Sequence, residues 1–157
     1  MKLTPGQVRD VLDLSQDTFK HWKKVLPPLI GRNGYRPCFT HGDLLAMAFI
    51  RALTDDACVQ VGALGAISAV LFDQCTKQPW AALERTVLIL ELPRIRVEFI
   101  SDQSSPQIAS LGIVVPCAPI IRDLRERLLM GEDDDLQGNL RFPPAVVATR
   151  TRRRSAS

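Results

Sequence analysis

Side chains that carry positive charge or donate hydrogen bonds gather in two short segments near the start of the chain. They are Lys20, His21, Lys23 and Lys24 in the first segment and Arg32 and Arg36 in the second. Lys, Arg and His donate to phosphate oxygens and to O6 and N7 of guanine, the groups that a duplex nucleic acid presents. The two segments therefore indicate nucleic-acid binding.

Residue types that carry out catalysis or hold metal ions show no comparable pattern. The two histidines, His21 and His41, both fall in the first third of the chain, and we expect His41 to face solvent. No glycine-rich phosphate loop follows a predicted strand, and the four cysteines include no Cys-x-x-Cys pair. We therefore expect no enzyme, no cofactor and no metal site.

The spacing of the cysteines and the length of the apolar runs indicate the cellular compartment of the protein. Widely spaced cysteines are typical of a reduced compartment, and we expect Cys58 and Cys75 to be buried, inert thiols. No apolar run approaches the roughly 20 residues that span a bilayer. The sequence thus predicts a cytoplasmic, nucleoid-associated protein with no membrane partner.

Charge is distributed unevenly along the 157 residues. The net charge is +3 in total, but it is +4 for residues 1–53, −5 for residues 54–149 and +4 for residues 150–157. Basic ends around an acidic middle are typical of a DNA-facing head, a body that binds something else and a cationic tail that reaches phosphate.

Three hydroxyl residues stand where they can cap helices that position the basic segments: Thr4, Ser15 and Thr40. Gln7 and Asp43 follow the first and the third by three residues, which is the spacing of a capping box. The predicted helices cover residues 5–12, 16–25 and 42–54. In the second helix, the spacing of Phe19 and Trp22 predicts a buried stripe.

Between the second and third helices, residues 29–39 read as a short hairpin, because Asn33-Gly34 is a preferred pair for a two-residue turn. Tyr35 in this segment either packs the hairpin onto the body or donates its hydroxyl to phosphate. A fourth, apolar helix is predicted over about residues 59–72.

The pattern changes from helical to alternating after Trp80. We predict strands over residues 86–92, 95–99 and 111–115, with the first two paired across a Pro93-Arg94 turn, and then a helix over residues 119–130. The acidic run 132–135 should end that helix. Two prolines, Pro143 and Pro144, then lead into four arginines within residues 150–154, which favours a disordered tail that adds sequence-independent attraction to DNA.

The first half of the chain resembles the MerR-type winged-helix family over about residues 4–72. Members share a recognition helix of the form Ser-x-x-Thr-Leu-Arg-aromatic-aromatic, and here the segment reads Ser-Gln-Asp-Thr-Phe-Lys-His-Trp from Ser15. Gly34-Tyr35-Arg36 matches the family's wing, and Asp43 and Leu53 fall within its third-helix pattern. Three features depart from the family: Lys20 replaces Arg, His21 replaces an aromatic residue, and the segment from Arg36 to Thr40 is one residue longer.

The resemblance implies a MerR-like winged helix-turn-helix at the N-terminus. With the strand-rich region and the one C-terminal helix predicted from the pattern after Trp80, the fold class is α+β. The resemblance places helix 16–25 in the major groove of double-stranded DNA and the 30–37 hairpin, as wing, on the backbone. The implied DNA-binding residues are Gln16, Asp17, Thr18, Lys20, His21, Lys23, Lys24, Arg32, Asn33, Tyr35 and Arg36. The implied protein is a bacterial or phage transcriptional regulator that binds as a homodimer.

The predicted organisation has three parts: residues 1–78 as the DNA-binding domain, residues 79–131 as a dimerisation or partner-binding region, and residues 132–157 as the tail. Two alternatives remain open. One is an excisionase-like or architectural factor of a phage or mobile element that bends DNA. The other is a protein-interaction module in which residues 86–130 bind a partner chain by edge pairing.

Overall fold

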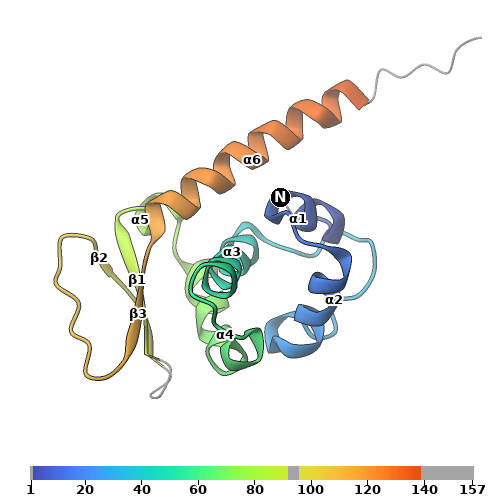
Figure 1. Ribbon diagram of the computed structural model, residues 1–157. Coiled ribbons are helices and arrows are strands. Elements are labelled where there is room, and N and C mark those ends of the chain that lie inside the picture. The colour runs from blue at the N-terminus through green and yellow to red at the C-terminus, as the bar shows by residue number, and fades with distance from the viewer. Residues whose placement is uncertain (1, 92–95, 139–157) are drawn as a thin grey trace, which may run out of the picture.

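The computed structural model describes residues 2–91 and 96–138, with side chains described up to residue 131. The structure combines helices with a small antiparallel sheet that lies at one edge of the molecule, as the predicted α+β class requires (Figure 1). The elements are α1 (Pro5–Leu12), α2 (Gln16–Val25), the 3₁₀ turn η1 (Pro27–Leu29), α3 (His41–Asp55), α4 (Val61–Lys77), α5 (Trp80–Leu83), β1 (Thr86–Glu91), β2 (Arg96–Ser101), β3 (Gly112–Pro116) and α6 (Cys117–Gly138). None of these described helices combines the length and the apolar character that crossing a membrane requires.

The three predicted caps are present. Thr4 with Gln7, and Thr40 with Asp43, form reciprocal capping boxes at α1 and α3, and the Ser15 hydroxyl accepts the Thr18 amide at 3.1 Å. Each cap satisfies a backbone donor that the first helical turn leaves without a partner. The bounds of α1 and α2 accordingly match those predicted from the sequence.

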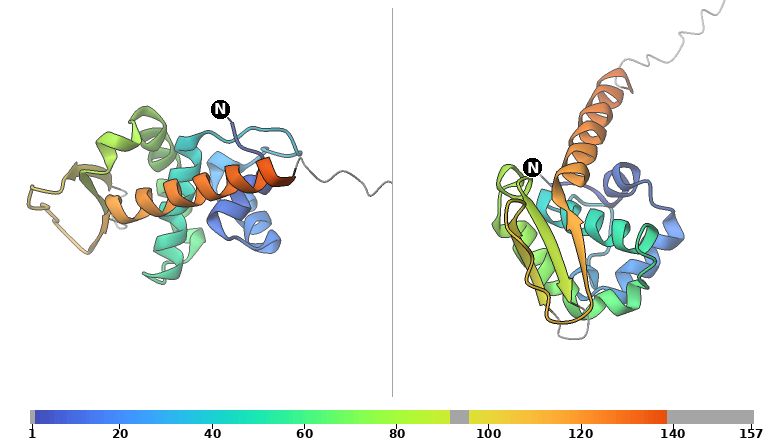
Figure 2. Two further views of the ribbon diagram at one scale, coloured as in Figure 1. Left: turned by 90° about the horizontal axis from the view of Figure 1, so that it is seen from above. Right: turned by 60° about the vertical axis from the view of Figure 1, so that its left-hand side comes forward.

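Helix α3 lies at the centre of the fold. Every residue from Gly42 to Ile50 is buried, so the helix is covered on all sides through this stretch. Helix α4 packs along it, and α6 crosses both α1 and α3 (Figure 2). The buried hydrophobic residues form one cluster, whose members range from Leu3 to Leu124 along the chain.

The sheet has the order β2-β1-β3, with both pairings antiparallel, which confirms the predicted hairpin of β1 with β2. Leu88 of β1 pairs with Phe99 on one side and Val115 on the other. This face packs on the helices, with the Phe99 ring 5.7 Å from that of Phe49 in α3. The sheet therefore packs directly against α3.

The hairpin predicted over residues 29–39 is wrong. Leu29 belongs to η1, and the Arg32 amide donates back to its carbonyl at 3.2 Å, so this backbone is already turned and cannot supply a first strand. Gly31 and Gly34 take positive φ angles of 81° and 107°. Residues 30–38, called the 30–38 loop below, contain no strand, and an isolated bridge joins Phe39 to Leu3.

Three other predictions need correction. Cys58 is exposed, in a left-handed turn with φ of 53°, rather than buried. Helix α4 continues five residues past its predicted end at Phe72. Helix α6 continues through the acidic run 132–135 to Gly138, because Glu and Asp residues can interrupt an apolar pattern without breaking a helix. The predicted Pro93-Arg94 turn and residues 139–157 of the predicted tail lie outside the described residues.

The close approach of α3 and α4 yields a stability prediction. A Cβ atom on Gly42 would lie 2.6 Å from the Thr76 Cα and 2.8 Å from the Cys75 carbonyl oxygen. We expect Gly42→Ala to lower the free energy of unfolding by about 1–3 kcal/mol through overpacking, although Ala is normally the better helix former.

Gly62→Ala, in the first turn of α4, is the matched control, because a Cβ there meets nothing within 4 Å. The free energy of unfolding of this variant should rise by roughly 0.5–1 kcal/mol. Urea denaturation measures both. If Gly42→Ala were as stable as Gly62→Ala, the two helices would have to be further apart than described.

Candidate nucleic-acid interface

Helices α1 and α2 form a helix-turn-helix pair with a very short connection. Asp13 ends α1 in the left-handed conformation, with φ of 50°, and its amide donates to the carbonyls of Arg9 and Asp10. Asp tolerates this conformation better than most residues. Leu14 follows, and Ser15 already caps α2. The direction of α2 is thus fixed by backbone hydrogen bonds on both sides of the turn.

Helix α2 has one buried side and one exposed side. Phe19 and Trp22 are each only 3% exposed, which confirms the predicted stripe. The opposite side carries six of the residues predicted to contact DNA, all of them exposed: Gln16, Asp17, Thr18, Lys20, His21 and Lys24. Lys23 is half-buried, with its Nζ atom 5.5 Å from the centroid of the Phe19 ring.

The exposed side of α2 is electropositive. It presents Lys20, Lys23 and Lys24 against one carboxylate, Asp17, which sits in the first turn where a negative charge suits the helix dipole. Among the described residues, no carboxylate forms an ion pair with any of these three lysines. The ammonium groups of the two exposed lysines, Lys20 and Lys24, are therefore available to an anionic ligand.

The 30–38 loop leaves η1, passes α2 and returns to the start of α3 (Figure 1). Its far end is anchored to α2, because the rings of Phe39 and Phe19 meet edge-on at 6.0 Å. Asn33, Tyr35 and Arg36 are exposed, and Tyr35 is 97% exposed. Tyr35 therefore does not pack the loop onto the body, which leaves its hydroxyl available to a ligand.

Arg32 lies apart from this exposed set. Its Nη1 atom donates to the Asp43 carboxylate at 2.7 Å, and its guanidinium lies 5.5 Å from the centroid of the Phe39 ring. Asp43 is only 4% exposed and also accepts from the amide and hydroxyl of Thr40. Arg32 thus fastens the loop to α3. The two partners are eleven positions apart in the sequence, so no local sequence pattern reveals this contact.

His41, expected to face solvent, is half-buried and meets the Trp80 ring edge-on at 5.9 Å. It therefore packs α3 against α5. Nothing in the local pattern around His41 points to a partner 39 residues away, and its expected exposure is wrong.

Two of the four cysteines are buried thiols. Cys75 and Cys117 are buried, and burial raises the pKa of both thiols above the ordinary value. These thiols therefore stay protonated at neutral pH, the unreactive form. Among the residues that the structure describes, no group of three or more His, Cys, Asp or Glu residues is placed to hold a metal ion.

Comparison of the chain with protein-family models, with curated proteins and with solved structures returned no match. The resemblance to MerR-type proteins therefore rests on the residues quoted above, and the function is argued from geometry and charge.

The role of Arg32 yields a second stability prediction. We expect Arg32→Ala to lower the free energy of unfolding by about 1–3 kcal/mol, because it removes a charged hydrogen bond from a buried carboxylate. Asn33→Ala, its exposed neighbour, should change stability by less than about 0.5 kcal/mol. Thermal and urea unfolding of the two variants measure this. Equal stabilities would mean that the Arg32 side chain does not hold the loop.

Proposed function

We propose that the chain is a sequence-specific DNA-binding transcriptional regulator of the MerR-like winged-helix type, acting in the cytoplasm on the nucleoid. The observation that carries the proposal is the exposed side of α2. Its lysines form no ion pair with the residues that the structure describes, and Phe19 and Trp22 pack the other side of the helix into the core.

The shape and charge of α2 suit the major groove. The groove of B-form DNA admits one α-helix, whose N-terminal residues approach the base edges while flanking cations contact phosphate. In that pose Gln16 and Thr18 meet bases, since Gln pairs with adenine and a Thr methyl contacts thymine. Lys20 and Lys24 then reach phosphates or guanine.

The 30–38 loop supplies the second contact. Arg36 and Tyr35 extend from an anchored base beside α2, which suits donation to the sugar-phosphate backbone. The loop would contact the backbone without the strand pairing of a conventional wing. Arg32 would hold the loop to α3 through Asp43 and would not contact DNA itself.

Dimerisation forms part of the proposal. One small head makes few phosphate contacts, and specific affinity usually comes from two half-sites joined by symmetry. Helix α6 offers a surface for this, since Leu129 and Met130, just past its middle, are 65% and 71% exposed. We expect a dimer in sedimentation velocity at micromolar concentration, and a monomer that stays monomeric on an inverted repeat would contradict this part.

A specific observation also favours a protein-interaction role for residues 86–130. Strand β3 is at the edge of the described sheet, with Val114 on it 41% exposed and Leu111 just before it 83% exposed. An edge strand with exposed apolar side chains is suited to pairing with a partner chain. In that case the basic face would bind DNA weakly and without sequence preference.

The DNA-binding prediction is tested by selecting random duplexes on the purified protein and then titrating the enriched duplex. We expect an enriched sequence. Lys20→Ala and Arg36→Ala should weaken binding and leave the unfolding midpoint unchanged, because both side chains are exposed. Loss of one phosphate contact should also reduce the salt slope by about one, whereas loss of a base contact should relax preference at one position by about 1–3 kcal/mol.

Lys77→Ala is the control. Like Lys20→Ala, it removes one positive charge from an exposed side chain, but Lys77 is the last residue of α4 and lies outside α2 and the 30–38 loop. This variant should bind DNA as the unmodified chain does. Wild-type affinity in both test variants would exclude the proposed face, and the absence of any enriched sequence would favour the protein-interaction role. Enrichment of phased direct repeats, in place of an inverted repeat, would favour an architectural, excisionase-like role.

A further inference from the structure

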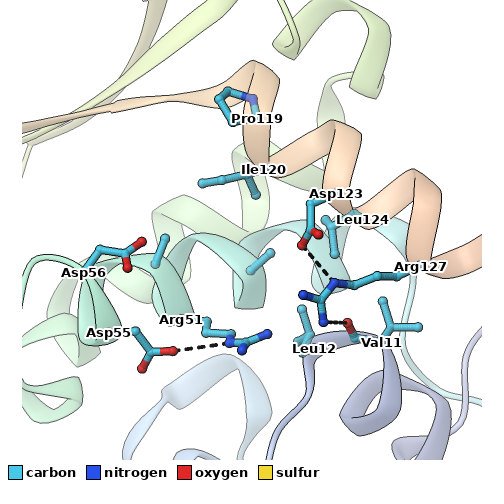
Figure 3. A pocket seen from close by; sticks show the side chains of 12 residues that line it. Val11, Leu12, Arg51, Asp55, Asp56, Pro119, Ile120, Asp123, Leu124 and Arg127 are labelled. Atoms are coloured by element: carbon cyan, nitrogen blue, oxygen red, sulfur yellow. Dashed lines mark hydrogen bonds and ion pairs between the residues drawn. The ribbon is translucent and has the colours of Figure 1, made fainter.

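A cleft of about 280 Å³ lies between the last turns of α1 and α3 and the first turns of α6 (Figure 3). Its lining includes no residue of α2 or of the 30–38 loop. The cleft is therefore separate from the proposed DNA-binding face, and the proposed function gives it no role.

The cleft has an apolar floor. Side chains from three helices form it, among them Leu12 of α1, Ala48 and Ala52 of α3, and Ile120 and Leu124 of α6. Leu12 and Leu124 are almost fully buried, so the floor is part of the packed core and is preformed. A floor of this kind takes an aliphatic or aromatic group and releases water from it.

Two guanidinium groups lie along one side of the cleft (Figure 3). Arg51 is held by Asp55, with its Nε atom at 3.3 Å, and by Asp13, with its Nη2 atom at 3.7 Å. Arg127 is held by Asp123 through its Nε atom at 2.9 Å and by the Val11 carbonyl through its Nη1 atom at 3.3 Å.

These contacts orient both arginines but do not use all their donors. Among the described residues, the Nη1 atom of Arg51 and the Nη2 atom of Arg127 have no hydrogen-bond partner. Each guanidinium therefore keeps N–H donors for an acceptor in the cleft, and a carboxylate is the acceptor that guanidinium donors match best.

Negative charge lies at the C-terminal end of α3. Asp55 is the last residue of the helix and Asp56 its C-cap, so two carboxylates stand beside the negative end of the helix dipole. Figure 3 shows the Asp56 carboxylate turned toward the cleft. Among the described residues Asp56 forms no ion pair, so this end of the cleft favours a cation.

We propose that this cleft binds a free α-amino acid with an apolar side chain. The ammonium group meets Asp56 and the α3 terminus, the carboxylate meets Arg51 and Arg127, and the side chain lies on the floor. A zwitterion can use both groups of charges at once, whereas a simple anion would face Asp56, which forms no ion pair among the described residues. The volume, at the lower limit for small-molecule pockets, suits one amino acid rather than a larger ligand.

The experiment is isothermal titration of the full chain with a matched set of small molecules. Leucine and phenylalanine are the probes. N-acetyl-leucine lacks the ammonium charge, leucinamide lacks the carboxylate, and glycine lacks the apolar group. We expect leucine or phenylalanine to bind, and each of the other three compounds to bind at least about tenfold more weakly, since each loses one class of contact.

Two variants test the assigned side chains. Arg127→Gln and Asp56→Asn should each weaken binding about tenfold or more, and Arg122→Gln, on α6 but outside the lining, should not. The titration of the unmodified chain remains decisive if a variant fails to fold. The proposal is overturned if leucine and phenylalanine give no heat at millimolar concentration, or if N-acetyl-leucine or leucinamide binds as tightly as leucine.

Discussion

The burial of helix α3 from Gly42 to Ile50 is the constraint on which the rest of the structure depends. A helix covered on all sides needs a partner for each face, and α4, α6, the sheet and the 30–38 loop are those partners. Gly42 makes the arrangement possible at one end, since it lets α4 approach where a methyl group would collide with backbone. The small sheet is held by the same helix, through Phe49 and Phe99, and needs no core of its own.

Helix α3 also connects the two candidate sites. Near its start, Asp43 holds Arg32 and so fixes the base of the exposed loop. At its last turn, Arg51, Asp55 and Asp56 form one wall of the cleft under α6. Helix α2, in contrast, touches the body through Phe19 and Trp22, which leaves its cations in solvent. The two candidate sites therefore lie at opposite ends of α3, and the buried middle of this helix joins them.

The sequence predicted those features that local interactions decide. The caps at Thr4, Ser15 and Thr40 depend on residues within three positions, so the helix starts could be placed, and alternation of apolar residues placed the strands. The exposed face of α2 followed from the spacing of Phe19 and Trp22. Long-range pairs could not be seen in this way. Arg32 finds Asp43, His41 finds Trp80, and Arg127 finds the Val11 carbonyl only once the helices are packed.

The same limit explains the wing and the cleft. Asn33-Gly34 is a good hairpin signal, but the two prolines before it turn the chain into η1 and remove the first strand. The cleft is lined by three helices that are far apart in sequence. From the sequence alone, its charged residues cannot be told from ordinary surface residues that form ion pairs within one helix.

The central claim is that the exposed side of α2 and the 30–38 loop meet DNA together. The most direct measurement is a nuclear magnetic resonance titration of the isotopically labelled chain with its selected duplex, following every backbone amide. The account predicts that the largest shift changes fall on residues 15–24 and 31–37, with α4 and the sheet unaffected. Largest changes on α4 or β3, with α2 unchanged, would contradict it.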